Sequence, residues 1–134
     1  SLKKFILNSI RQNLSQNSVP VLYTSRQIVS TKDNNELIQF QYFLSAFIAE
    51  IVSAIKYEIG YLISKGGITT NTIISEGLEA HSVYLEGQIL PGISLVTFNL
   101  FKQKAKLPIV TFPGNIGNNM SLVHTLEILE NKKF

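Results

Sequence analysis

The chain has 134 residues, a net charge of +3 and no cysteine, which excludes disulfides, thiolate zinc sites and cysteine nucleophiles. Hydrophobic residues make up 45% of the chain and charged residues only 16%, which fits one domain with a real core and argues against disorder. The basic residues form only short runs, as solvated faces and tails do, so the sequence predicts no nucleic-acid partner. The start shows no signal peptide, and the lack of cysteine fits a reducing compartment, so we expect a cytoplasmic protein.

Helices and strands alternate in the first half of the chain. Apolar residues at three-and-four spacing predict a helix over Leu2–Leu14. Val19–Tyr23 is typical of a short buried strand that runs into a polar "TSR" loop. An apolar stripe from Leu37 to Ile59 predicts the longest helix, largely buried and ended by Gly60, before a second buried strand at Tyr61–Ile63.

The stripe from Leu37 to Ile59 is also the longest apolar-rich stretch of the chain. A membrane span of about 20 residues should be nearly free of strongly polar side chains. Here the stretch is interrupted by Gln39, Gln41, Glu50, Lys56 and Glu58. The sequence therefore predicts no membrane span and a soluble protein.

The second half of the chain is richer in strands. A helix is expected over Thr70–Gly77, and two strands joined by a turn at Pro91-Gly92 follow it. A polar excursion then leads to a strand over Leu107–Phe112. The last helix is expected over Ser121–Leu129, with Ser121 as its cap and Leu122, Leu126 and Leu129 on its apolar face. This order predicts an α/β fold, a mixed β-sheet flanked by helices in a single domain.

Three polar loops, "TSR", "KGGITT" and "PGNIGNN", each follow an expected buried strand. Ligands of open α/β sheets bind where such loops meet, outside the carboxyl ends of the strands. In the second loop, Gly66 and Gly67 let a ligand approach the backbone, and Thr69 and Thr70 add hydroxyls beside a helix start. This pattern suits a phosphate, with Lys65 either adding charge or simply solvated. The alternative is a strand-to-helix turn with a threonine cap.

The third loop repeats the pattern, because Gly114 and Gly117 bracket Asn115, and Asn118 and Asn119 supply further donors. Neither glycine loop matches a P-loop or the dinucleotide fingerprint, since Gly-Lys-Ser/Thr and G-x-G-x-x-G are both absent.

Acid–base groups are few. Asp33 is the only aspartate, Glu50 and Glu58 lie on the long helix, and His81 and His124 show no metal-ligand spacing. The sequence therefore identifies no catalytic residue and no metal ligand, and a catalytic base is expected from elsewhere.

Four motifs in order, "YTSR", "KGGITTNTI", "GQILPGISL" and "VTFPGNIG", resemble the C-terminal nucleotide-binding domain of the four-carbon acid sugar kinases, such as the D-threonate, D-erythronate and 3-oxo-tetronate kinases. The resemblance covers about Val19 to Leu129. It implies ATP binding, with Mg²⁺ held through the ATP phosphates. The implied ATP contacts belong to the three loops and are Ser25, Gly66, Gly67, Ile68, Thr69, Gly114, Asn115 and Gly117, while Gln88 and Pro91 are weaker candidates.

The sequence departs from this family in two ways. Ile68, Asn118 and Asn119 stand where relatives often carry acidic residues, which further weakens any metal site. The chain also has room only for the nucleotide-binding domain, residues 1–134, so the N-terminal domain that binds the sugar acid is expected outside it. The chain is expected to be either an excised domain or a natural fragment, and the opening without methionine favours the first. A homodimer remains open.

The alternative function is a non-catalytic anion-binding or interaction module whose glycine loops are only turns. In that case ATP would not affect stability, whereas a kinase domain is stabilised by ATP·Mg.

Overall fold

The computed structural model describes residues 1–25, 32–100 and 105–131. They form two compact units, Ser1–Leu44 and Ser45–Phe134. Helices and a four-stranded mixed sheet make up the structure, which confirms the expected α/β class.

The first unit opens with helix α1, Leu2–Ser15, where the sequence predicts it. The side chain of Ser1 caps this helix, since its hydroxyl accepts a hydrogen bond of 3.3 Å from the Lys4 backbone N–H. The expected strand at Val19–Tyr23 is wrong, because these residues form no strand and Tyr23 is 83% exposed. A strand needs a neighbour for its backbone groups, and the described part of Ser1–Leu44 contains only helices and coil.

Helix α2, Asn34–Ile55, starts in the first unit and ends in the second. It stops four residues before the expected end, and a turn follows in which the Glu58 N–H donates to the Ile55 carbonyl. Only the half within the second unit is buried, whereas Phe43 is 69% exposed. The expectation that much of this helix is buried therefore holds only for its second half, because an apolar periodicity marks a face without saying what covers it.

Among the described residues, α2 is long and apolar enough to cross a membrane by length and composition alone, with a mean hydropathy of 1.5. Two of the charges expected to interrupt it, Lys56 and Glu58, lie beyond its end. The core helix of a soluble protein passes the same test, and the second half of α2 has that character, with Ala49 and Ile51 almost fully buried.

The sheet lies within the second unit and has the order β1-β4-β3-β2. Its strands are β1 Leu62–Lys65, β2 Tyr84–Leu90, β3 Ile93–Leu100 and β4 Ala105–Phe112. β1 runs parallel to β4, and the β4–β3 and β3–β2 pairs are antiparallel. The turn at Pro91-Gly92 joins β2 to β3 as expected, while the expected excursion over Lys102–Lys106 lies mostly outside the described residues.

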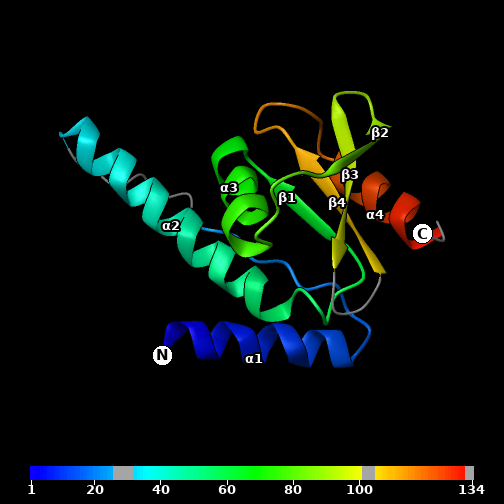
Figure 1. The fold of residues 1–134 in the computed structure, drawn as a ribbon, viewed down its shortest axis with the longest axis horizontal. Coiled ribbons are helices and arrows are strands. Elements are labelled where there is room, and N and C mark those ends of the chain that lie inside the picture. The colour runs from blue at the N-terminus through cyan, green and yellow to red at the C-terminus, as the bar shows by residue number, and fades with distance from the viewer. Residues whose placement is uncertain (26–31, 101–104, 132–134) are drawn as a thin grey trace. The chain divides into compact units, whose positions relative to one another are not determined.

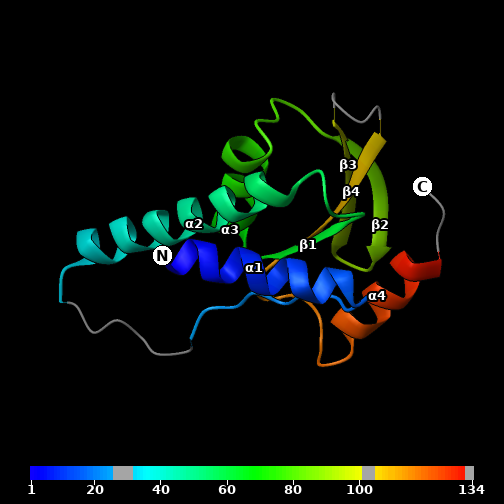
Figure 2. The same cartoon turned by 90° about the horizontal axis from the view of Figure 1, so that it is seen from below.

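Helices cover both faces of this sheet (Figures 1 and 2). On one face lies α3, Gly67–Thr72, which continues directly into a π-helical turn, η1, at Ile73–Gly77. The apolar core on this face of the sheet includes Ile73, Val96 and Ile109, together with residues of the second half of α2. On the other face, α4 (Ser121–Asn131) packs Leu129 against strand residues such as Val110.

The final helix α4 is confirmed in place but differs in detail. Ser121 is its first residue rather than its cap, and the Ser121 hydroxyl accepts a hydrogen bond from the Asn118 N–H at 2.8 Å. Leu122, expected on the apolar face, is exposed, whereas Leu129 is buried. The buried residues of α4 are Ser121, Thr125 and Leu129, which follow one another at four-residue spacing, so Leu122 lies one position off the buried face.

Tyr61 ties the start of β1 to the end of α4, because its hydroxyl donates a hydrogen bond to Glu130 Oε1. Burial, with the hydrogen bond to the Glu130 carboxylate and its charge, raises the pKa of Tyr61 from 10.0 to about 12. Since the folded-state pKa lies above the unfolded one, this contribution to stability is fully present below pH 10 and is lost as the pH rises towards about 12.

We therefore expect the free energy of unfolding to fall between pH 10 and pH 12, and less steeply in Tyr61→Phe. Urea unfolding at several pH values measures this difference. Glu130→Gln should lower the pKa of Tyr61 only in part, because burial is the larger cause. An equal pH dependence in Tyr61→Phe and the unsubstituted chain would contradict the assignment.

Candidate functional site

The carboxyl ends of β1 and β4 lie side by side, because the two strands are parallel neighbours with Lys65 opposite Phe112. The two glycine loops that follow these strands therefore start from the same edge of the sheet, as the sequence predicts. The Gly66 N–H donates to the Phe112 carbonyl at 2.9 Å, which fixes the first loop to the end of β4. Ser25, of the expected "TSR" loop, is exposed in the unit Ser1–Leu44, and its neighbour Arg26 lies outside the described residues.

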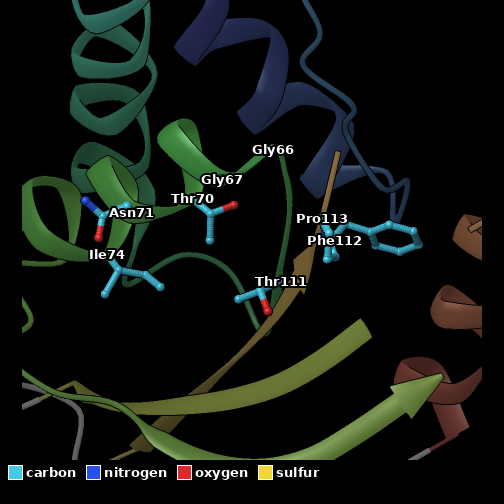
Figure 3. Close-up of a pocket in the computed structure, with 8 residues that line it drawn as sticks. All are labelled: Gly66, Gly67, Thr70, Asn71, Ile74, Thr111, Phe112 and Pro113. Atoms are coloured by element: carbon cyan, nitrogen blue, oxygen red, sulfur yellow. The ribbon is translucent and has the colours of Figure 1, made fainter. Parts of the chain in front are cut away.

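A hollow of about 330 Å³ opens at this edge of the sheet, within the size range of small-molecule sites (Figure 3). Two groups of residues line it, one from the start of α3 and one from the end of β4: Gly66, Gly67, Thr70, Asn71, Ile74, Thr111, Phe112 and Pro113. Figure 3 shows the Phe112 ring turned away from the side chains of the helix, so this residue borders the hollow mainly with its backbone. None of the lining side chains is charged.

The helix at the hollow begins earlier than the sequence predicts. α3 starts at Gly67, three residues before Thr70, and its N-cap is Gly66, which has φ +102° and no capping side chain. The alternative of a strand-to-helix turn with a threonine cap is therefore right about the turn between β1 and α3 and wrong about the cap. The Thr70 N–H already bonds to the Gly66 carbonyl at 3.0 Å, and the Thr70 hydroxyl lies 2.8 Å from the buried Ser64 hydroxyl.

The start of α3 presents backbone donors rather than a charged side chain. Gly67, Ile68 and Thr69 form the first turn, where backbone N–H groups have no intrahelical acceptor. The Ile68 side chain is exposed, and Thr69 Oγ1 lies 3.4 Å from Ser45 Oγ on α2. Gly66 and Gly67 have open space where a side chain would stand, so a ligand group can come close to the backbone.

The second glycine loop contributes less to the hollow than the resemblance implies. Gly114, Asn115 and Gly117 are all exposed, and none of them lines it. The loop is fastened by Lys65, whose ammonium donates to the carbonyl oxygens of Pro113 at 3.4 Å and Gly114 at 3.3 Å. The Lys65 charge also lies 5.1 Å from the centre of the Phe112 ring, so this lysine holds the loop and is not among the lining residues.

The far end of the second loop is held by local contacts. The Asn118 side-chain oxygen accepts from the Met120 N–H at 2.9 Å, which gives this asparagine a structural role in the turn. A side chain at Gly92, in the β2–β3 turn, would meet Ile116 at 3.1 Å. Gln88 accepts from the Gly92 N–H at 3.3 Å, so the "GQILPG" motif shapes a turn that supports the loop.

Five lining residues were not among the site residues expected from the sequence: Asn71, Ile74, Thr111, Phe112 and Pro113. Asn71 and Ile74 share the helical face of Gly67 and Thr70, and this spacing is visible once the helix is started at Gly67. Thr111 stands one residue before the end of β4, and only the strand register shows that it faces α3.

Within residues 1–25, 32–100 and 105–131, no group of three or more His, Cys, Asp or Glu side chains could hold a metal ion. His81 and His124 are both exposed. Any metal at the hollow would therefore be held by the ligand and not by a protein carboxylate cluster of the described residues.

The comparisons with known proteins agree with this architecture. A solved structure of a domain of unknown function from Bordetella bronchiseptica, a domain-swapped dimer with bound citrate, superposes with a TM-score of 0.63. The likeness covers 96% of this chain at 15% identity, which shows the fold alone, and this chain spans only 32% of that one. None of the curated proteins compared with the chain matches it. The family model described as the nucleotide-binding C-terminal domain matches residues 2–122, and the chain therefore belongs to this family of nucleotide-binding domains.

Proposed function

We propose that the chain is the ATP-binding part of a kinase that phosphorylates a four-carbon sugar acid of the threonate, erythronate or 3-oxo-tetronate type. The observation that carries the proposal is the hollow at the carboxyl ends of the parallel strands β1 and β4, bordered by Gly66 and Gly67. Ligands of α/β sheets bind at this edge. Membership of a nucleotide-binding family supports a nucleotide as the ligand.

The chemistry of the hollow suits a nucleotide. Ile74 and Pro113 offer apolar surface for a flat base, and Asn71 offers an amide that can both donate and accept. The open first-turn amides of Gly67 and Ile68 can donate to phosphate oxygens. The nucleotide would thus be held by neutral donors and by shape.

The metal ion, the sugar-acid site and the catalytic base that the reaction needs would not come from the described side chains. Mg²⁺ would be held through the ATP phosphates, where it neutralises their charge during phosphoryl transfer. An N-terminal domain would bind the sugar acid and supply the catalytic base. We further propose a cytoplasmic enzyme, and the domain-swapped dimer of the solved neighbour is consistent with a homodimer.

Thermal unfolding with and without ATP·Mg tests the proposal, with AMP·Mg as the control. A ligand that binds only the folded chain adds about 2.7 kcal/mol of stability at 100 times its dissociation constant. We expect ATP·Mg to raise the midpoint by several degrees, and by more than AMP, because AMP lacks the β and γ phosphates. The non-catalytic module instead predicts no nucleotide-dependent shift, and that result would overturn the proposal for this chain.

A further inference from the structure

The α3-facing side of the sheet is apolar in its middle. Leu62, Ile109 and Val96 are register partners on β1, β4 and β3, so their side chains form one row across three strands. All three belong to the apolar core under α2 and α3. Nothing polar interrupts the face at this level.

On the same face, the next row of side chains towards the hollow is polar in every strand. Ser64 on β1 is the partner of Thr111 on β4, and Thr111 is the partner of Ser94 on β3. Gln88 on β2 pairs in turn with Ser94. A row of three hydroxyls and an amide therefore crosses the sheet at the level of the hollow, next to a row of aliphatic side chains.

We call this set the hydroxyl row: Ser64, Thr111, Ser94 and Gln88. Its members differ in the hydrogen bonds that their side chains make. Ser64 is buried and its hydroxyl lies 2.8 Å from that of Thr70, so it fastens α3 to the sheet. The Thr111 hydroxyl donates to the Ser94 carbonyl over 3.4 Å, at the outer limit for a hydrogen bond. Thr111 is half-buried and lines the hollow, so a ligand can draw its hydroxyl away at little cost.

The hydroxyl row has donors and acceptors but no charge, which suits a hydroxylated group better than a phosphate. We infer that Thr111, the one member of the row that lines the hollow, binds a ribose hydroxyl of the nucleotide, an inference that rests on the proposed function. The base then lies against Ile74 and Pro113, and the phosphates lie towards Gly67. Thr111 is a ribose contact, and Ser64 is a positioning residue that acts through Thr70.

The experiment compares the dissociation constants of ATP and 2′,3′-dideoxy-ATP for the chain and for Thr111→Val, which keeps the branched shape and removes the hydroxyl. Loss of one neutral hydrogen bond should weaken ATP binding about threefold to tenfold. Dideoxy-ATP should bind the unsubstituted chain more weakly than ATP, and Thr111→Val should weaken it no further. Thr111→Ser retains a hydroxyl and should restore the preference for ATP.

Thr125→Val is the matched control, since Thr125 lies on α4, on the opposite face of the sheet. Its hydroxyl is fully buried and, among the described residues, without a hydrogen-bond partner, so its removal should leave folding and both affinities intact. Equal losses for ATP and dideoxy-ATP in Thr111→Val, or no loss for either, would overturn the ribose assignment alone. A chain that binds no ATP at all would overturn the proposed function with it.

Discussion

Gly77→Ala is expected to lower the free energy of unfolding by about 2–3 kcal/mol, as overpacking of a close contact does. Gly77 ends the π-helical turn η1 and is buried against α2. A methyl group added there would lie 2.8 Å from the Ala49 carbonyl oxygen and 3.4 Å from two further backbone atoms. A backbone neighbour cannot rotate away as a side chain can, so α2 and η1 would have to separate.

Urea unfolding of Gly77→Ala measures the effect, and Gly60→Ala is its control. A methyl group at Gly60 meets no atom within 4 Å, so this variant should unfold like the unsubstituted chain. The η1 turn continues the helix α3 that borders the hollow and itself contributes Ile74 to the lining, so Gly77→Ala should also weaken ATP binding. Equal stability of the two variants would contradict the packing of η1 on α2.

The second prediction compares Gly66→Ala with Gly67→Ala. The two glycines differ in backbone conformation but not in the space available to an added methyl group. An added methyl meets no atom within 4 Å at either position. Gly66 has φ +102°, which an alanine adopts only with strain, so its replacement should cost about 1–3 kcal/mol of stability. Gly67 lies in the first turn of α3, where alanine is favoured by up to about 1 kcal/mol.

ATP binding should respond differently from stability in these variants. Gly66→Ala shifts the loop and should lose both stability and ATP affinity. Gly67→Ala should fold at least as well as the unsubstituted chain, yet bind ATP about tenfold more weakly, because its methyl group stands where the ligand approaches. Calorimetric titration gives the affinities, and unchanged ATP binding in Gly67→Ala would show that the nucleotide does not approach this backbone.

Local sequence patterns correctly predicted those helices and strands whose formation depends mainly on their own residues. The apolar spacing of α1 and the strand–turn–strand of β2 and β3 agree with the structure. The neighbouring glycine loops were also predictable, because parallel strands bring their carboxyl ends to one edge. These inferences need only periodicity, turn chemistry and one general rule of α/β sheets.

The predictions that were wrong or missing concern features that depend on contacts between distant parts of the chain, which local sequence patterns do not reveal. Val19–Tyr23 has the composition of a strand, but no strand lies beside it within the described part of Ser1–Leu44. The start of α3 at Gly67 follows from a glycine N-cap, which leaves no capping side chain to recognise. Thr111 enters the site only through the register of β4 with β1, a long-range pairing.

The resemblance and the geometry agree on the first glycine loop and differ on the second. Gly66 and Gly67 border the hollow, and Ile68 and Thr69 follow them in the first turn of α3. Gly114, Asn115 and Gly117 lie in the loop after Pro113 without lining it. Their ATP contacts, like that of Ser25, stay predictions, and a ligand longer than the hollow would reach the second loop first at Gly114.

The central claim is that a nucleotide occupies the hollow between α3 and β4, and amide chemical shifts of the labelled chain during an ATP·Mg titration test it most directly. We expect the largest changes at residues 66–71 and at Thr111, Phe112 and Gly114, with smaller changes along α4, and weaker changes in the first group with AMP. Large changes confined to α4 or to the β2–β3 hairpin, or no change at saturating ATP·Mg, would contradict it.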